Sequence, residues 1–283
     1  MEQWNLIIDV ARCHNCNNCF LACKDEHVGN NFPGYSAPQP LHGHQWFFIE
    51  SRERGQMPMV DVAFRPTTCN HCREAPCVEQ ATAGSVYQRE DGIVMIDPDK
   101  ARDKKEIVAS CPYGAIWWNE QEQLAQKWNF DAHLLDQDSS GLRCEQVCPT
   151  DVFRSFKVED SEMERIAVEE GLQTLHPEFG TRPRVYYKNL DWFTKHFIGG
   201  TLVSEADGIS TAVSGVAVRL EKDGVEMQAT QTDQYGDFKF DGLEDHSGRY
   251  TVQYDSPGQG RCETSFEFNE SVYLGIFSLS DVP

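Results

Sequence analysis

The sequence predicts an α+β chain made of two unlike halves. All cysteines except Cys262 lie between residues 13 and 148, and several of them are closely spaced. Residues 197–283 instead contain short runs in which apolar and polar residues alternate, separated by turn pairs such as Asp223-Gly224. Alternation bounded by such turns is typical of antiparallel strands. We therefore expect a cysteine-rich domain at 1–160, a helix and extended connector at 161–196, and a C-terminal antiparallel β-sandwich of about seven strands at 197–283.

Composition excludes several classes of function. The formal net charge of −20 argues against nucleic acid as a partner, because phosphate binding needs a basic surface. No apolar run approaches the ~20 residues of a membrane-spanning helix. The start, Met1 to Trp4, has no basic region followed by a long apolar run, so we expect no secretory signal and a cytoplasmic location. In such a chain, grouped cysteines favour metal binding over disulfides.

The elements expected in the first 195 residues are short and separated by loops. Apolar runs predict strands, Gly- and Pro-rich stretches predict loops, and a loose apolar face that includes Met163 and Ile166 predicts a helix. In chain order we expect a strand at 6–10, a long loop at 24–45, strands at 46–51 and 92–97, a hairpin of 115–118 with 124–130, a strand at 152–158, a helix at 161–176 and an extended connector at 177–195.

The first cysteine group is the most informative motif. Cys13, Cys16, Cys19 and Cys23 have the spacing C-x2-C-x2-C-x3-C. In bacterial ferredoxins, the first three cysteines of such a run bind one iron–sulfur cluster and the fourth binds another. The first three therefore need a remote fourth ligand, and Cys148, which precedes Pro149, fits that role.

A second cysteine group likewise has three closely spaced members and needs a remote fourth. Cys69, Cys72 and Cys77 form a compact loop without a fourth cysteine, and Cys111-Pro112 is the nearby candidate. We therefore predict two tetrads that each hold a [4Fe-4S] cluster in tandem ferredoxin-like modules. Any four cysteines could instead bind zinc, although zinc sites seldom use such a run with crossed partners. Two complete tetrads need no histidine ligand, so we expect polar packing of the nearby histidines, which are His14, His42, His44, His71 and His133.

These motifs resemble those of the iron–sulfur subunits that accompany molybdopterin enzymes of the dimethyl-sulfoxide-reductase type. The marks are the first cysteine run, Cys69-x-His71-Cys72-x3-Pro76-Cys77, and the Cys111-Pro112-Tyr113-Gly114 stretch. Within that family, the chain is similar along nearly its whole length to small subunits of enzymes that hydroxylate or transhydroxylate phenols. The resemblance implies a large partner subunit that carries molybdenum bound by two pterin guanine dinucleotides.

The chain departs from the family at two further cluster sites. We expect one site to be lost, because the family has cysteines where this chain has Ala81, Ala101, Lys104 and Ile107. A third site is degenerate, because Trp128 and Asp131 replace two cysteines and only Cys23 and Cys144 remain. We expect this third site to be empty and partly filled by Trp128, with Cys23 and Cys144 close in space. The alternative is an unusual cluster that uses Asp131 as a ligand.

The expected function is electron transfer within a heterodimeric molybdenum oxidoreductase that acts on a phenolic substrate in the partner subunit. The chain itself then needs no active site, and no Ser/His/Asp or paired-carboxylate arrangement stands out. Two alternatives stay open at this point, a free-standing ferredoxin-type carrier and a structural subunit with vestigial clusters. The lone Cys262 is expected to be a buried or idle thiol.

Overall fold

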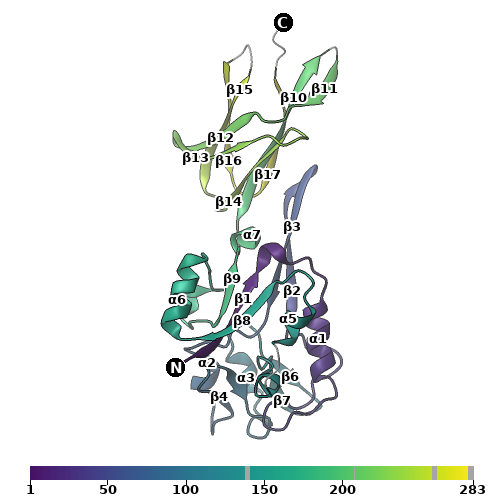
Figure 1. Cartoon of the computed structure of the whole chain (residues 1–283), viewed down its shortest axis with the longest axis vertical. Coiled ribbons are helices and arrows are strands. Elements are labelled where there is room, and N and C mark those ends of the chain that lie inside the picture. The colour runs from purple at the N-terminus through teal and green to yellow at the C-terminus, as the bar shows by residue number, and fades with distance from the viewer. Residues whose placement is uncertain (138–140, 207, 257–259, 280–283) are drawn as a thin grey trace. The chain divides into compact units, whose positions relative to one another are not determined.

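The computed structural model describes residues 1–137, 141–206, 208–256 and 260–279 (Figure 1). The chain divides into two compact units. The first unit comprises Met1–Ser51 and Phe64–Leu190, and the second comprises Arg52–Ala63 and the chain from Asp191 onward. The helix and connector expected at 161–196 are therefore mostly part of the first unit, and a segment inserted in the cysteine-rich half belongs to the second.

The first unit is built on a three-stranded sheet in the order β8-β1-β9. β1 (Gln3–Asp9) lies in the middle, with β8 (Phe153–Val158) antiparallel and β9 (Val185–Lys188) parallel to it. Leu6, Ile7 and Ile8 are all buried, as expected for a central strand covered on both faces. The segment expected as an extended connector at 177–195 thus contributes a sheet strand, which sequence spacing alone did not predict.

Helix α6 (Asp160–Glu169) covers one face of this sheet (Figure 1). Met163 is fully buried and shares a small core with Ile7 and Tyr186. The helix is shorter than the expected 161–176, because the chain turns at Gly171 with a positive φ of 62°. Leu175 therefore lies beyond the helix.

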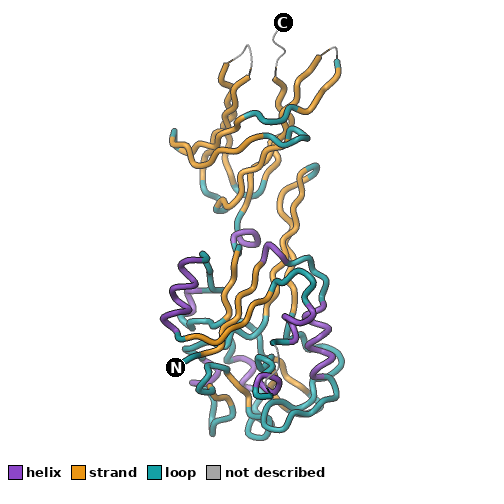
Figure 2. Tube along the Cα trace, in the orientation of Figure 1, coloured by secondary structure: helices purple, strands orange, loops and turns teal. Residues whose placement is uncertain are grey.

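Much of the rest of the first unit is loop, interrupted by short elements (Figure 2). The expected hairpin after Cys111 is confirmed, although its strands are shorter. The loop expected from residue 24 begins only after His27, where α1 ends. The remaining helices and hairpin strands are η1 (Val10–Arg12), α1 (Asn18–His27), α2 (Pro76–Glu79), β4 (Val86–Gln88), β5 (Val94–Ile96), α3 (Glu106–Ala109), β6 (Trp117–Asn119), β7 (Leu124–Gln126), α4 (Ala132–Leu135), α5 (Arg143–Val147) and η2 (Pro177–Phe179).

The second unit contains two four-stranded sheets. One has the order β11-β10-β14 with β17 also paired to β10, and the other has the order β13-β12-β15-β16. Every strand pair in these sheets is antiparallel except β10–β17, which is parallel, so the expectation of a wholly antiparallel domain was wrong there. The elements are α7 (Asp191–Thr194), β10 (His196–Ala206), β11 (Ile209–Ala212), β12 (Ala217–Lys222), β13 (Val225–Gln231), β14 (Asp237–Leu243), β15 (Gly248–Ser256), β16 (Gly260–Phe268) and β17 (Val272–Leu279).

One hydrophobic core joins the inward faces of both sheets. It includes Leu202 and Phe238 from the first sheet and Leu220 and Val252 from the second. Cys262 is half-buried against this core and interacts with the side chain of Tyr254, and the buried or idle thiol expected from the sequence stays a prediction.

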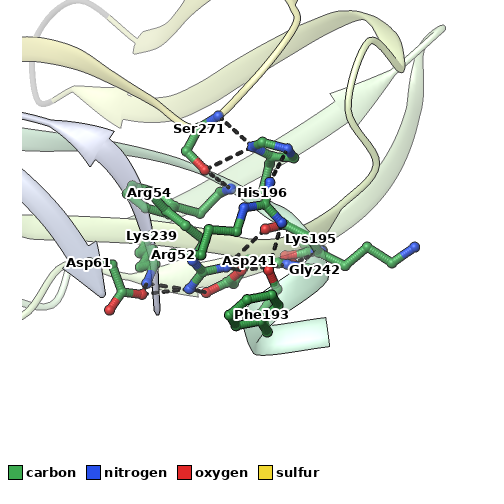
Figure 3. Close-up of polar contacts among 12 residues, drawn as sticks. Arg52, Arg54, Asp61, Phe193, Lys195, His196, Lys239, Asp241, Gly242 and Ser271 are labelled. Atoms are coloured by element: carbon green, nitrogen blue, oxygen red, sulfur yellow. Dashed lines mark hydrogen bonds and ion pairs between the residues drawn. The ribbon is translucent and has the colours of Figure 1, made fainter. Parts of the chain in front are cut away.

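β2 (Phe48–Gln56) and β3 (Met59–Thr67) pair in a two-stranded sheet whose residues 52–63 belong to the second unit. Arg54, whose side chain is 0% exposed, donates to Asp241 Oδ1 at 2.8 Å and to Asp61 Oδ2 at 2.5 Å (Figure 3). Lys239 pairs with the same two carboxylates, at 2.8 and 3.1 Å. Two cations and two carboxylates thus neutralise one another, which removes the cost of burying a lone charge.

No helix in the described ranges has the length and apolar character that crossing a bilayer requires.

Candidate iron–sulfur sites

The first tetrad consists of Cys13, Cys16, Cys19 and Cys148. The first three lie on the loop after η1 and at the start of α1, and Cys148 caps the end of α5. Helices α1 and α5 pack against each other, which brings the remote cysteine to the loop. Burial, together with the charges of the other three sulfurs, raises the pKa of Cys19 to about 12, so the four thiols are electrostatic neighbours.

Backbone donors surround the sulfurs of the first tetrad. The Val152 amide donates to Cys148 Sγ at 3.4 Å. Amides of Asn15 and Phe20 donate to Cys13 and Cys19 and oppose the rise in pKa that burial causes in both thiols. Such donors stabilise thiolates, the form in which cysteine binds metal. Cys16 is exposed, so this tetrad lies at the surface of the first unit.

The second tetrad consists of Cys69, Cys72, Cys77 and Cys111. All four line a single cavity whose wall also includes Val94, Ile116 and Tyr113. Cys77 is carried by α2, and Cys111 follows directly after α3 and Ser110. The crossed assignment made from the sequence therefore joins residues that the fold brings to one cavity.

The chemistry of this cavity suits a thiolate-ligated group. Burial raises the pKa of Cys72 and Cys77 to about 12, and other sulfurs of the tetrad add to the rise. Amides of Tyr113 and Ala115 donate to Cys111 and oppose the rise there. Neutral thiols would bind no metal, so loading the site has to release protons. The donor set fits an iron–sulfur cluster, which is anionic and accepts hydrogen bonds at sulfur.

Lys127 is a member of the second site that the sequence analysis missed. It lines the same cavity and is buried, with 4% of the residue exposed. Its Nζ donates to the carbonyl oxygens of Val94 at 2.6 Å and Trp128 at 3.0 Å. No motif marks this lysine, because only the pairing of distant segments places it beside the cysteines.

At the degenerate third site, the three residues that remain as candidate ligands, Cys23, Cys144 and Asp131, are all buried. Burial raises the pKa of both thiols well above the ordinary value, and the Asp131 carboxylate raises it further. Asp131 already has protein partners, because Trp128 Nε1 donates to Oδ1 at 3.0 Å and the Arg143 amide donates to Oδ2 at 2.9 Å. The two cysteines form no disulfide.

The positions of the site that the resemblance predicts to be lost lie largely in apolar packing. Ala101 and Ile107 are buried in one hydrophobic core together with Val86 and Leu124, and Ala81 packs against it. Lys104, at the remaining family position, turns to the surface and donates to the Thr82 carbonyl at 3.0 Å.

His71 contributes to packing and hydrogen bonding, as the sequence analysis expected. Its Nδ1 accepts a hydrogen bond from the Val94 amide at 3.1 Å, and its ring makes edge contacts with Trp128 and Phe130. In the described part of the chain, no three His, Cys, Asp or Glu side chains converge closely enough to hold a single metal ion.

Comparison with known proteins agrees with this chemistry. Residues 60–158 match the model of the 4Fe-4S dicluster domain, a segment that contains the whole second tetrad and Cys148. The pyrogallol hydroxytransferase small subunit of Pelobacter acidigallici is 45% identical over 99% of this chain and 100% of its own length.

More distant relatives match about two thirds of this chain. The putative dimethyl sulfoxide reductase iron–sulfur subunit of Halobacterium salinarum is 30% identical over 67% of this chain and 80% of its own. The B subunit of sulfite dehydrogenase from Allochromatium vinosum is 32% identical over 66% of this chain and 83% of its own. The resemblance inferred from the cysteine motifs is thereby confirmed, and the chain belongs to the family of iron–sulfur electron-transfer subunits of molybdenum oxidoreductases.

Proposed function

We propose that this chain carries two [4Fe-4S] clusters, one at each tetrad, and transfers electrons for a large molybdenum subunit that acts on a phenolic substrate. The observation that carries the proposal is that the eight predicted cysteines form two separate groups of neighbours, one of which lines a common cavity. When bound, such clusters exchange one electron at a time.

The tetrads contribute differently to this role. The exposed Cys16 places the first tetrad where a redox partner can approach it, whereas Cys69 and Cys72 of the second are buried. The hydrogen bonds from backbone amides hold the thiolates in position without adding charge. The chain itself supplies ligands, orientation and exclusion of water.

The partner subunit is proposed to hold molybdenum on two pterin guanine dinucleotides, as the family resemblance implies. The phenolic substrate is suggested by the identity to the pyrogallol hydroxytransferase small subunit over the full length of both chains. The two sheets of the second unit, with their common core, support our proposal of a β-sandwich appended to tandem ferredoxin-like modules. The cytoplasmic location stays a prediction.

The proposal of two clusters has one specific alternative, which is a third cluster at the degenerate site. Cys23 and Cys144 are each close enough to Asp131 for its carboxylate to act on their thiols, and a third cluster would use these three residues as ligands. We propose that this site is empty, because both carboxylate oxygens of Asp131 accept hydrogen bonds from the protein. Trp128, which is fully buried, occupies part of the space of the missing cysteine ligands.

Anaerobic purification of the native complex, followed by iron, zinc and molybdenum analysis, tests the proposal. We expect about eight irons per small subunit, corresponding to two cubanes, and molybdenum in a co-purifying large subunit. About twelve irons would establish the third cluster. Zinc in place of iron would support zinc sites instead. A chain that purifies alone with its clusters would support the free-standing carrier. Absence of an EPR signal after reduction would favour a structural subunit.

A further inference from the structure

Lys127 is unusual because its positive charge is buried without a carboxylate partner. Among the residues that the structure describes, its Nζ has hydrogen bonds only to the carbonyl oxygens of Val94 and Trp128. A buried ammonium is costly unless an anion compensates it. The arrangement therefore indicates that an anion belongs beside it in the functional protein.

The cavity that Lys127 lines identifies that anion. Its charge opposes the burial that raises the pKa of Cys77 and Cys111, so it acts on the sulfurs of the second tetrad. Four thiolates and four sulfides around four irons leave a [4Fe-4S] centre with a charge of about −2 when oxidised and about −3 when reduced. At the first tetrad, the interactions given for Cys13 and Cys19 come from burial, backbone amides and the other sulfurs.

We propose that Lys127 is the residue that raises the reduction potential of the cluster held by the second tetrad. This inference rests on the proposed function. Burial disfavours the reduced state, because that state carries the larger charge. The ammonium of Lys127 offsets this effect, since its attraction grows as the negative charge grows. One electron enters from an external reductant such as dithionite, no bond forms or breaks, and the proton stays on Nζ.

The test is an EPR-monitored redox titration of the anaerobically purified complex. Lys127→Gln removes the charge but keeps amide donors for the two carbonyl oxygens, and Lys127→Arg keeps the charge. Lys105→Gln is the matched control, because Lys105 is an exposed lysine of the same unit paired with Glu120. The signal of the second cluster is assigned by its loss in Cys111→Ser.

We expect Lys127→Gln to shift the midpoint potential of the second cluster to a more negative value, while the first cluster is unchanged. Lys127→Arg should keep the potential of the second cluster close to the wild-type value, and Lys105→Gln should leave both potentials as in the wild type. Loss of the second cluster in Lys127→Gln but not in Lys127→Arg would support a role for the positive charge, because only Lys127→Arg keeps that charge.

Three outcomes overturn the inference. They are equal potentials in Lys127→Gln and the wild type, an equal shift of both clusters, and loss of the second cluster in both Lys127 variants. In each of these cases the wild-type iron content still supports the proposed function. Wild-type protein without iron would overturn the proposed function as well, so the two failures are distinguishable.

Discussion

The second tetrad and the region of Ala81, Ala101 and Ile107 pack around the same hydrophobic core. They differ in the kind of side chain that each buries there. At the tetrad, the side chains that face the cavity are thiols, whose pKa is raised by burial. At the other region, methyl and larger alkyl groups fill the place where the family has cysteines. If the proposed assignment holds, ordinary core packing replaces a cluster at one region, whereas the other region keeps thiols that need a ligand.

The third site lies between these extremes. Its two cysteines survive, but its carboxylate is already satisfied by Trp128 Nε1 and the Arg143 amide. We therefore expect a cluster site to need donors that are free to bind it, and not cysteines alone. The following changes test that expectation from the largest expected effect to the smallest.

Replacing Cys111 by serine should have the largest effect. The substitution removes one thiolate from the second tetrad, and we expect a loss of up to about four irons per chain, because four thiolates are the usual ligand set of such a cluster. Iron analysis and EPR of the purified complex measure the loss. Cys262→Ser is the control, since Cys262 packs against the core of the second unit, and its iron content should match the wild type. An unchanged iron content in Cys111→Ser would contradict the assignment.

Asp131→Ala removes the acceptor of two donors at the third site. Each buried donor left without a partner costs about 1–3 kcal/mol, so we expect the free energy of unfolding of the first unit to fall by about 4 kcal/mol. Hydrogen exchange around residues 128–148 in increasing urea measures this change.

The exposed Asp99→Ala serves as the control for Asp131→Ala and should change little. Iron content should stay the same in Asp131→Ala. A loss of about four irons would show that Asp131 is a ligand and that the third site holds a cluster.

Ile107→Ala tests whether the lost site is a genuine core. Ile107 is 4% exposed, and truncation of such a side chain leaves a cavity that costs about 3 kcal/mol. Thermal unfolding of the first unit should report this loss. Val168→Ala, at a position that is 83% exposed, should be nearly neutral. Equal effects of the two substitutions would mean that the region contributes no packing energy.

Lowering the pH should have the smallest effect, which we expect on the stability of the second unit. In that unit, buried and partly buried charges are paired with one another. Burial alone would raise the pKa of Asp61, but hydrogen bonds from Lys239 and Arg54 outweigh it and leave that pKa below its ordinary value. Arg54 and Lys239 likewise lower the pKa of Asp241 against the effect of burial. A lowered folded-state pKa stabilises the fold above the unfolded pKa of about 3.9.

This stabilisation is lost as the pH falls from about 4 through the lower folded-state pKa. The melting temperature of the second unit should therefore drop between pH 5 and pH 3. Asp61→Asn should reduce the size of that drop, whereas Asp223→Asn, at an exposed turn, should not. A drop of the same size in Asp61→Asn would remove this carboxylate from the explanation.

The spacing of residues in the sequence was sufficient to predict features that depend on residues close together in the chain. The runs around Cys13 and Cys69 predicted three ligands each, because a short loop has to aim several sulfurs at one centre. The alternating runs after residue 197 likewise predicted strands that the structure contains. The Cys-Pro pairs even suggested the remote partners Cys111 and Cys148.

Only the tertiary structure decided what lies beside these elements. It placed Lys127 in the cavity of the second tetrad, made β9 a parallel partner of β1, and assigned residues 52–63 to the second unit. These features depend on contacts between segments far apart in the chain, and such contacts leave no period or spacing in the sequence. Ligand identity is a local property of the residues, whereas the electrostatic surroundings of a ligand are a property of the packed fold.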